Sequence, residues 1–349
     1  MQQRRKKNRP RGAGSATTMT GRNGDVETHL PRIEEVRTAG ELIYRFMRPT
    51  EQYCWPLLCE RVGTEVWVKQ ENQTSTGSFK ARTAVVYVDE LMKREPGTRG
   101  LIAATRGNHG QSVALAARRF GLTATILVPH GNSQEKNAAM RAQGATLIEH
   151  GKDFQEAREK AMALAAEQGL HMVPPYHYDI VRGVATYWLE LFSSVKEIDV
   201  AYVPIGMGSG ICSGVAVRNG LGLKTKLIGV VSEGAPSYAE SFEQGRVVEV
   251  AVTTKVADGM ACRKPDEEPL AILLKNVEHI VRVSDEEVEE AMRCMFTDTH
   301  NVVEGAGAAA LAAALQEKEQ LRGKRVAVVA SGANVDREVL ARVLRGERA

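Results

Sequence analysis

Lys80 stands at the end of a polar, glycine-containing turn and at the start of a helical pattern. The stretch 69–82 reads K-Q-E-N-Q-T-S-T-G-S-F-K-A-R, and it follows the β-branched segment 65–68. Residues 81–91 then carry apolar side chains at helical spacing. A lysine at such a junction is well placed to point into a cleft, where its amine can act as a nucleophile or a base. Most lysines are solvated surface charges, so this interpretation depends on the rest of the chain.

Three further loops combine glycine with polar side chains, and each follows a short apolar run. The first, T-R-G-N-H-G-Q at 105–111, offers backbone N–H groups at a helix N-terminus to a small anion such as a carboxylate. The second, I-G-M-G-S-G-I-C-S-G at 205–214, lets the main chain approach a phosphate closely. The third, S-G-A-N-V-D at 331–336, begins with a serine that can bond a heteroatom or cap the next helix.

The spacing in the second loop argues against a dinucleotide. Gly206, Gly208 and Gly210 alternate, and the distance to Gly214 does not match G-x-G-x-x-G. No acidic residue ends the next strand at the usual distance, since Glu233 lies too far on. We therefore predict a monophosphate here, which disfavours a nicotinamide oxidoreductase.

Alternating strands and helices would position these loops. We expect strands at 101–104, 123–128, 146–149 and 172–173, and then at 200–203, 227–232, 280–283 and 325–330. Capping boxes are expected at Asp153 with Glu156 and at Ser284 with Glu287, and an alanine-rich helix over 306–321. Because ligands bind where parallel strands end, the loops should meet at one edge of an α/β fold.

The chain is long enough for two lobes around a cleft. It has 349 residues, 43% hydrophobic and 26% charged, as in globular proteins. We expect a smaller substrate-side domain at 100–176 and a large domain from 23–99 and 177–349, with no room for a C-terminal regulatory domain. No apolar run approaches the roughly 18 residues that span a bilayer, so no membrane partner is expected.

The net charge of +3 belongs to the N-terminus. Six basic residues lie within the first eleven, so the rest of the chain carries −3. We interpret 1–22 as a disordered basic tail without the apolar core of a secretory signal. A basic tail can touch nucleic acid, but a solvated extension is the simpler interpretation, and we expect no nucleic-acid partner.

Cysteine usage indicates reduced thiols. The five cysteines (Cys54, Cys59, Cys212, Cys262 and Cys294) are odd in number, scattered and without a C-x-x-C pair. This pattern is typical of a cytoplasmic protein and argues against a zinc cluster. Cys212 lies in the glycine loop, and we interpret it as a packing residue.

The lysine, the anion loop, the phosphate loop and the strand-end hydroxyl together describe one ligand, pyridoxal 5'-phosphate. Its aldehyde needs a lysine Schiff base, its phosphate a glycine-rich cradle and its ring nitrogen a partner. The chain also resembles the threonine dehydratase and serine racemase family of fold-type II pyridoxal-phosphate enzymes from about residue 32 to 345. The motifs that carry the resemblance are E-N-Q-T-S-T-G-S-F-K, R-G-N-H-G-Q, the glycine loop, A-D-G at 257–259, V-E-G-A-G-A-A-A-L from Val303, and S-G-A-N-V-D.

The resemblance implies two open, twisted, mainly parallel sheets with helices on both faces, as in the tryptophan synthase β-like fold, and a homodimer. It also implies site roles. Lys80 would be the Schiff-base lysine and proton-transfer base, and the implied cofactor-binding residues are Lys80, Phe79, Asn108, Gly206, Met207, Gly208, Ser209, Gly210, Glu304 and Ser331. The implied substrate-binding residues are Thr105, Arg106, Gly107, Asn108 and His109. Asn108 would bond the cofactor's 3-hydroxyl, and Ser331 would meet the pyridine nitrogen. A neutral hydroxyl cannot keep that nitrogen protonated, which favours prompt β-elimination.

The sequence departs from the family pattern at three places. Arg106 replaces a serine that serves racemases as acid and base, and arginine does not deprotonate, so racemisation is disfavoured. Arg106 either attracts an anionic or bulky β-substituent or points to solvent. Met207 adds one residue to the glycine loop, which leaves assignments there open by one position. Glu233 of the racemase cation site is present but the aspartate near Ala239 is absent, so no metal is expected.

We therefore expect a lyase that removes water from a β-hydroxy α-amino acid and releases a 2-oxo acid and ammonia. Threonine or serine is the default substrate, and Arg106 keeps 3-hydroxyaspartate and phenylserine open. The alternatives are a β-replacement synthase, an amino-acid racemase and a silent amino-acid-binding protein on the same scaffold. Intact Lys80, Asn108 and Ser331 argue against the silent binding protein.

Overall fold

The computed structural model describes residues 26–347. The α-helices are α1 (Ile33–Ile43), α2 (Pro56–Val62), α3 (Ala81–Arg94), α4 (Asn108–Arg119), α5 (Gln134–Ala142), α6 (Phe154–Gln168), α7 (Tyr178–Ser194), α8 (Ser209–Gly220), α9 (Ser237–Gln244), α10 (Glu267–Asn276), α11 (Asp285–Thr299), α12 (Gly305–Gln316) and α13 (Arg337–Leu344). Three 3₁₀ turns are η1 (Glu71–Gln73), η2 (Asp258–Met260) and η3 (Lys318–Leu321). The strands are β1 (Gln52–Cys54), β2 (Glu65–Lys69), β3 (Gly100–Ala104), β4 (Thr123–Val128), β5 (Thr146–Glu149), β6 (His171–Met172), β7 (Val200–Pro204), β8 (Lys226–Ser232), β9 (His279–Val283) and β10 (Arg325–Val329).

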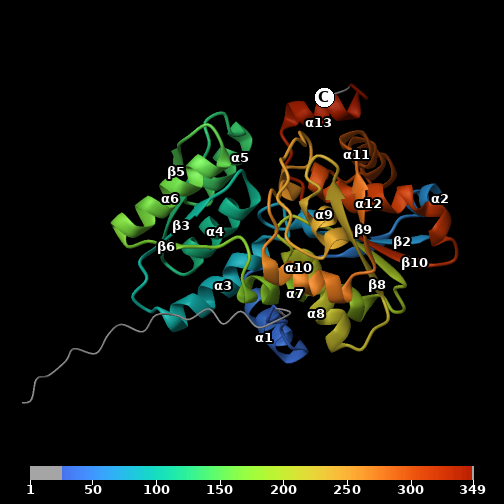
Figure 1. The fold of residues 1–349 in the computed structure, drawn as a ribbon, viewed down its shortest axis with the longest axis horizontal. Helices are drawn as coiled ribbons and strands as arrows, with labels where there is room; N and C mark the ends of the chain where they lie inside the picture. Colours follow the sequence, from blue (N-terminus) through green and yellow to red (C-terminus); the bar gives the residue numbers. More distant parts are fainter. Residues whose placement is uncertain (1–25, 348–349) are drawn as a thin grey trace, which may run out of the picture.

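The strands form two sheets, which lie in two lobes (Figure 1). The larger sheet has the order β1-β2-β10-β7-β8-β9, and every pair in it is parallel except the antiparallel edge pair of β1 with β2. The smaller sheet has the order β5-β4-β3-β6 and is parallel throughout. This arrangement confirms the predicted α/β fold with two mainly parallel sheets.

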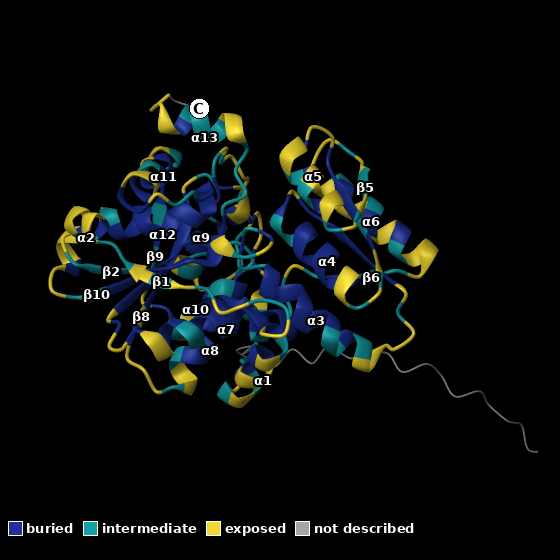
Figure 2. Ribbon diagram, turned by 180° about the vertical axis from the view of Figure 1, so that it is seen from behind, coloured by how far each residue is buried: buried dark blue, intermediate teal, exposed yellow. Residues whose placement is uncertain are grey.

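Helices cover both faces of each sheet because the strands are apolar on both sides. In β10, Ala327 and Val329 pack into the core shared with α8, while Val326 and Val328 pack into the core shared with α12. In β3, alternate residues divide in the same way between the α4 side and the α6 side. Runs that are apolar at every position are what a doubly covered parallel sheet requires. Figure 2 shows the resulting buried layers inside both lobes.

One hydrophobic core joins the lobes. Helices α3 and α7 pack along each other, and their buried residues share a cluster with β3 and α4 of the smaller sheet and with β7 and β10 of the larger sheet. Helix α3 begins directly after Lys80. The helix that follows the turn is therefore anchored in the most extensive core of the molecule.

Two local expectations need correction. Asp153 caps α6 by accepting a hydrogen bond from Glu156 N, but the Glu156 carboxylate bonds Lys152 N and does not complete a capping box. The alanine-rich helix ends at Gln316, short of the expected residue 321, because the chain tightens into the 3₁₀ turn η3 at Lys318–Leu321. The expected capping box of Ser284 with Glu287 is present. The expected tail, 1–22, lies outside the described residues.

Within residues 26–347 there is no helix both long enough and apolar enough to cross a membrane.

Candidate active site

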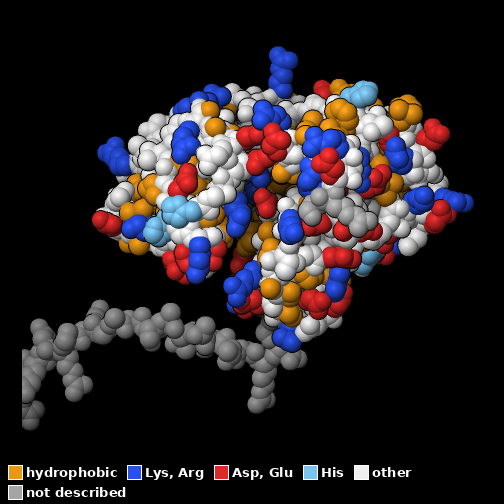
Figure 3. Space-filling model, turned by 90° about the horizontal axis from the view of Figure 1, so that it is seen from above, with side chains coloured by type: hydrophobic (Ala, Val, Ile, Leu, Met, Phe, Trp, Pro, Cys, Tyr) orange, Lys and Arg blue, Asp and Glu red, His pale blue; other side chains and the backbone are white. Residues whose placement is uncertain are grey.

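The four loops singled out in the sequence all follow the carboxyl ends of parallel strands. The turn 70–80 follows β2, the loop 105–107 follows β3, the loop 205–208 follows β7, and the loop 330–336 follows β10. Figure 3 looks down on the molecule and shows a hollow between the lobes that is rimmed by both basic and acidic side chains. The ends of parallel strands are where this class of fold binds ligands.

The lysine turn is joined to the serine loop by the main chain. Phe79 N donates to Ser331 O at 3.0 Å, and Ala333 N donates to Gly77 O at 2.8 Å. Gly77 has φ +67°, and a Cβ there would lie 2.9 Å from Asn334 Oδ1. Only glycine adopts this conformation readily beside such a close neighbour. The turn therefore depends on glycine to bring Lys80 beside Ser331.

Asn108 is fixed from two directions. Its Nδ2 donates to Glu304 Oε1 at 2.7 Å, and its Oδ1 accepts from Asn334 Nδ2 at 2.7 Å. Asn334 Nδ2 also donates to Thr76 O at 2.8 Å. These bonds connect the anion loop, the turn, the serine loop and the start of α12. The second N–H of the Asn108 amide has no acceptor among residues 26–347 and can bond a ligand.

Glu304 is a buried carboxyl at the centre of this group. Burial raises its pKa above the usual value, while Lys136, the bond from Asn108 and the charge of Lys80 act in the opposite direction. A Cβ on Gly332 would lie only 2.5 Å from Glu304 Oε1, so the serine loop passes directly over the carboxylate. Glu304 therefore lies in contact with the strand-end loop that begins at Ser331.

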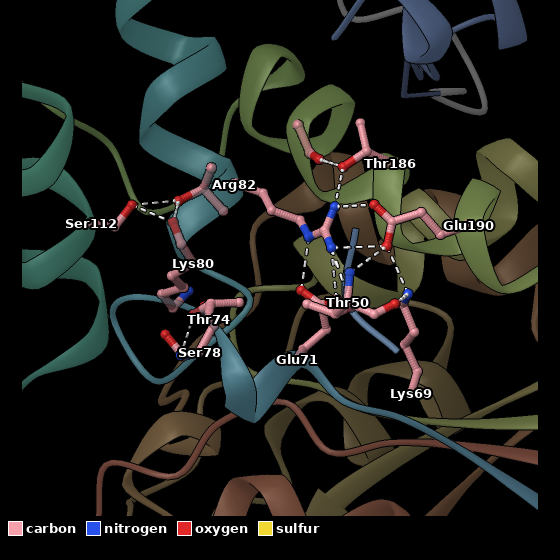
Figure 4. Close-up of polar contacts among 12 residues, drawn as sticks. Thr50, Lys69, Glu71, Thr74, Ser78, Lys80, Arg82, Ser112, Thr186 and Glu190 are labelled. Atoms are coloured by element: carbon pink, nitrogen blue, oxygen red, sulfur yellow. Dashed lines mark hydrogen bonds and ion pairs between the residues drawn. The ribbon is translucent and has the colours of Figure 1, made fainter. Parts of the chain in front are cut away.

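The Lys80 amine is held in a protein environment that favours its neutral form. Burial lowers the pKa of Lys80 to about 8, against the opposing effect of Glu304. Its Nζ lies 4.9 Å from the centre of the Phe79 ring. The carbonyl of Lys80 accepts a hydrogen bond from Ser112 (Figure 4) and another from Thr83. An amine with this pKa is a competent nucleophile and base near neutral pH.

The anion loop brings His109 close to Lys80. Burial, followed by the charge of Lys80, lowers the pKa of His109 to about 4, so the imidazole is neutral, and its Nε2 lies 3.4 Å from Val173 O. Thr105 is buried, and its Oγ1 accepts from Gly107 N at 3.0 Å. The backbone N–H groups that open α4 have no acceptor inside the helix, as at any helix N-terminus.

Arg106 is the predicted site residue that the structure does not join to the others. Its side chain is exposed, and its guanidinium makes no hydrogen bond or ion pair with any described residue. Only its carbonyl is engaged, accepting from Asn132 Nδ2 at 3.3 Å. The cation that does lie over the loop is Lys136, whose Cδ would be 3.0 Å from a Cβ on Gly107.

The glycine loop forms the N-terminus of α8. Gly208 is the N-cap with φ +94°, and Ser209 and Gly210 open the helix. A Cβ on Gly206 would lie 2.4 Å from Gly259 O, which is inside any tolerable contact. Tyr238 donates to Met207 O at 3.1 Å and so fixes the loop from outside. Free N–H groups and the helix dipole make this a suitable anion site.

Two aromatic residues connect the glycine loop to the lysine turn. The Phe79 and Tyr187 rings meet edge to face, with centroids 6.3 Å apart, and Trp188 Nε1 donates to Gly210 O at 2.9 Å. Tyr187 and Trp188 are neighbours on α7 and are both fully buried. The glycine loop is therefore held at a fixed position relative to Lys80.

Lys69, Glu71, Arg82 and Glu190 form a buried ionic cluster beside the turn (Figure 4). The Arg82 guanidinium bonds both carboxylates, and Lys69 Nζ lies 2.6 Å from Glu190 Oε2. Burial alone would raise the pKa of Glu190, but Arg82 and Lys69 hold it below its usual value. Two cations and two anions therefore neutralise one another at the two ends of the segment that carries Lys80.

Several of these residues were missed in the sequence. No sequence motif marks Lys136, Tyr187, Trp188 or Arg82. Among them, only Arg82 carried a signal, because it lies two residues after Lys80. Asn334 was inside a recognised motif and was assigned no role. Its position three residues after Ser331 on the same strand-end loop was the available signal.

Comparison with known proteins gives the same picture. A family model described as "Pyridoxal-phosphate dependent enzyme" matches residues 43–332. The chain is 35% identical over 314 residues to the L-threonine ammonia-lyase of Thermotoga maritima, covering 89% of this chain and 78% of that protein. It is 33% identical over 320 residues to the L-threo-3-hydroxyaspartate ammonia-lyase of Saccharomyces cerevisiae, covering 91% of this chain and 98% of that protein. The solved structure of the processed form of threonine deaminase isoform 2 from Solanum lycopersicum superposes with a TM-score of 0.83 at 28% identity, covering 91% of this chain and 90% of that one.

The described residues fit pyridoxal phosphate. The cofactor needs a near-neutral lysine amine, an anion site of backbone N–H groups and polar partners for its ring, and Lys80, the α8 N-terminus, and Asn108 with Ser331 supply them. The buried hydroxyls of Thr76 and Ser78 in the lysine turn have no hydrogen-bond partner among the described residues. Unpaired buried hydroxyls are costly, and a polar ligand at this turn would satisfy them.

Proposed function

This chain belongs to the family of pyridoxal-phosphate-dependent enzymes, and we propose that it is an ammonia-lyase that eliminates water from a β-hydroxy α-amino acid. The products are a 2-oxo acid and ammonia. The single observation that carries this proposal is the Lys80 amine with its pKa near 8, beside a backbone anion loop and a neutral partner for the ring nitrogen. Such a lysine can both hold the cofactor and move a proton.

Each part of the site has a task in this reaction. Bound pyridoxal phosphate supplies an electron sink that acidifies the α-proton of the substrate. Lys80 would hold the cofactor through its amine, and Nζ would accept the α-proton of the substrate. The amides at the start of α4 and Thr105 orient the substrate carboxylate, and neutral His109 adds no competing charge. The α8 N-terminus, formed by Gly208, Ser209 and Gly210, binds the phosphate.

Ser331 favours elimination over a slower outcome. Its hydroxyl donates to Ala306 O at 3.2 Å and, turned toward the cofactor, would donate to the ring nitrogen instead, but it carries no charge that would hold that nitrogen protonated. Asn108, fixed by Glu304 and Asn334, bonds the 3-oxygen. A weaker electron sink would favour prompt loss of the β-hydroxyl after the α-proton has left. Arg106 in place of a serine removes a second base and disfavours racemisation.

The substrate we propose is threonine, serine or 3-hydroxyaspartate. The relatives at 35% and 33% identity are named for threonine and for L-threo-3-hydroxyaspartate, and the two identities do not separate these substrates. Arg106 is exposed and free of described partners, so it is the residue we propose as the attraction for an anionic β-substituent.

We further infer a homodimer in the cytoplasm, with a small domain at 100–176 and a large domain formed by 23–99 and 177–349. The division into domains is supported by the four-stranded sheet, whose strands all fall between residues 100 and 172. Five free thiols are in keeping with the cytoplasm. Light scattering on the purified protein tests the dimer.

The proposal is tested by purifying the full chain with pyridoxal phosphate and screening release of 2-oxo acid across β-hydroxy amino acids. The wild type should be yellow and active, and Lys80→Ala should lose both the absorbance and the activity. A wild-type protein that stays colourless with added pyridoxal phosphate contradicts the assignment. Arg106→Ser, run beside it, should lower activity on 3-hydroxyaspartate more than on threonine, and an unchanged ranking would remove Arg106 from the specificity argument.

A further inference from the structure

Two cysteines outside the active site lie in sulfur contact. Cys54 is the last residue of β1, the edge strand of the larger sheet, and Cys59 lies in the helix α2 that follows. Their Sγ atoms are 3.1 Å apart, and both residues are free thiols. The sequence shows five scattered cysteines and no C-x-x-C pair, so this contact was not expected.

The local backbone dictates the contact. Trp55 is the N-cap of α2 and Pro56 is its first residue, so Cys54 and Cys59 occupy the positions before the cap and four into the helix. Side chains at these two positions pack together at helix N-termini, where they usually form a hydrophobic staple. Cys59 N donates to Trp55 O at 2.9 Å, which closes the first turn. Val66 N on β2 also donates to Cys59 Sγ at 3.3 Å, so the strand that follows α2 helps to hold the pair in place.

The pair is accessible, whereas the other cysteines are not. Cys54 and Cys59 are half-buried, while Cys212, Cys262 and Cys294 are buried. The flanking Tyr53 and Leu57 are 47% and 56% exposed, so this edge of the sheet faces solvent. A small reagent that reaches the protein surface reaches this pair first.

We propose that Cys54 and Cys59 form a dithiol modification site that low-molecular-weight disulfides oxidise to an intramolecular disulfide. The Cys59 thiolate attacks one sulfur of the reagent and releases one thiol, leaving a mixed disulfide at Cys59. Cys54 then attacks the Cys59 sulfur and releases the second thiol. The protein thiols lose two electrons and two protons, and the reagent gains both, so one disulfide forms as another is reduced.

The electrostatics of the pair set this order of attack. Burial, and then the hydrogen bond and charge of Cys59, raise the pKa of Cys54 to about 12, which makes Cys54 a poor first nucleophile. Once Cys59 is in the mixed disulfide, the thiol that faces Cys54 is gone and the part of the shift that Cys59 contributes is relieved. Closure requires the sulfurs to approach by about 1 Å, to the length of a disulfide bond of about 2.05 Å.

The disulfide would link β1, the edge strand of the larger sheet, to helix α2. Cys54 pairs with Trp67 of β2, and β2 leads into the turn that carries Lys80. The proposal does not depend on the reaction catalysed at Lys80, since it rests on the contact of the two thiols alone.

The test is to incubate the native, cofactor-loaded full chain with oxidised glutathione, block remaining thiols and map them by mass spectrometry. No Lys or Arg lies between Pro49 and Glu60, so one tryptic peptide carries both cysteines. That peptide should become lighter by two hydrogens and carry no glutathione, while three of the five thiols remain. Dithiothreitol should restore all five.

Two variants make the result decisive. Cys54→Ser should stop at a stable glutathione adduct on Cys59, and Cys59→Ser, which lacks the second thiol, should form no intramolecular disulfide. A wild-type protein that accumulates the glutathione adduct without closing the ring contradicts the proposal. So does preferential loss of Cys212, Cys262 or Cys294. The same incubation in urea, where all five thiols are exposed, separates the native contact from intrinsic reactivity.

Discussion

The guanidinium of Arg82 donates two parallel hydrogen bonds to the carboxylate of Glu71, from Nε to Oε2 at 2.8 Å and from Nη2 to Oε1 at 2.9 Å. Glu71 begins the turn and Arg82 lies two residues beyond Lys80, so the ion pair closes the segment into a loop. Both side chains are fully buried. Bidentate pairing fixes geometry as well as charge. The position of the Lys80 backbone is therefore set by this pair.

Arg82→Met should destabilise the protein strongly, because it leaves the Glu71 and Glu190 carboxylates buried without their main partner. Breaking a buried pair in this way typically costs about 3–5 kcal/mol. The free energy of unfolding in urea is the measurement. The same variant should release pyridoxal phosphate faster in a dilution experiment, because the turn loses its closure.

The matched control for Arg82 is Arg61→Met. Arg61 also forms a two-bond pair, with Asp298 at 2.5 and 2.8 Å, but on α2 and α11, and its side chain is 38% exposed. It should lose less stability and keep the cofactor release rate of the wild type. Equal release rates for the two variants at conditions where both are folded would show that Arg82 is a stability residue alone.

The rate at which the cofactor-free protein takes up pyridoxal phosphate should depend on the protonation of Lys80. Only a neutral amine attacks the cofactor's carbonyl, and burial sets the pKa of Lys80 at about 8. The uptake rate should rise about tenfold per pH unit below that value and level off above it. Stopped-flow absorbance from pH 6.5 to 9.5 gives the profile. A rate that still rises about tenfold per pH unit at pH 9.5 would mean that the amine is solvated.

The lowered pKa of Lys80 also makes the stability of the cofactor-free protein depend on pH. The folded cofactor-free protein releases the Lys80 proton near pH 8, whereas the unfolded chain holds it up to about 10.5. Between these values the unfolded state binds more protons, so the contribution of Lys80 to stability rises with pH. Below pH 8 its penalty is present in full. Lys80→Met should lack this rise, and the difference between the two urea curves isolates it from other groups.

Glu304→Gln should move the uptake midpoint to lower pH. The Glu304 carboxylate raises the pKa of Lys80, and a neutral amide removes that effect while it can still accept the hydrogen bond from Asn108. An opposite charge nearby commonly shifts a pKa by about one unit or more, so a fall of about one unit is expected. A midpoint that rises, or that stays at the wild-type value, would falsify the placement of Glu304 beside the amine.

The fold was largely predictable because most of its strands can be recognised in the sequence. Thr123–Val128 and Thr146–Glu149 have the expected bounds, since each is a β-branched or apolar run between polar turns. β1 was not expected, because three residues at a sheet edge carry no periodicity. The end of α12 was placed too late because residues 318–321 form a 3₁₀ turn, which the apolar pattern does not separate from the α-helix before it.

The site was predictable as a set of motifs but not as a geometry. The bond between Asn108 and Glu304 joins residues 196 positions apart, and no local pattern announces it. Arg82 followed Lys80 in the sequence and resembled a surface charge, yet it is fully buried. Arg106 drew attention as a departure from a family pattern, and its guanidinium lies in solvent. Which charges turn inward depends on partners that only the fold brings together.

Gly208→Ala should weaken cofactor binding well beyond its effect on stability. Gly208 has φ +94°, and a Cβ there would lie 2.8 Å from Pro269 Cβ and 3.0 Å from the Tyr238 hydroxyl. Tyr238 holds the Met207 carbonyl, so the added methyl group pushes apart the loop that opens α8. We expect the affinity for pyridoxal phosphate, measured by fluorescence titration of the cofactor-free protein, to fall at least about tenfold, or about 1.4 kcal/mol.

Gly222→Ala is the matched control, because it lies just past the other end of α8. Gly222 has φ +65°, and no atom lies within 4 Å of a Cβ placed there. Its substitution carries the backbone strain of a left-handed residue, on the order of 1 kcal/mol, without a clash. Both variants should therefore lose stability, but only Gly208→Ala should lose affinity. Equal affinities would mean that the N-terminus of α8 does not hold the phosphate, and the anion site would then have to lie at the start of α4.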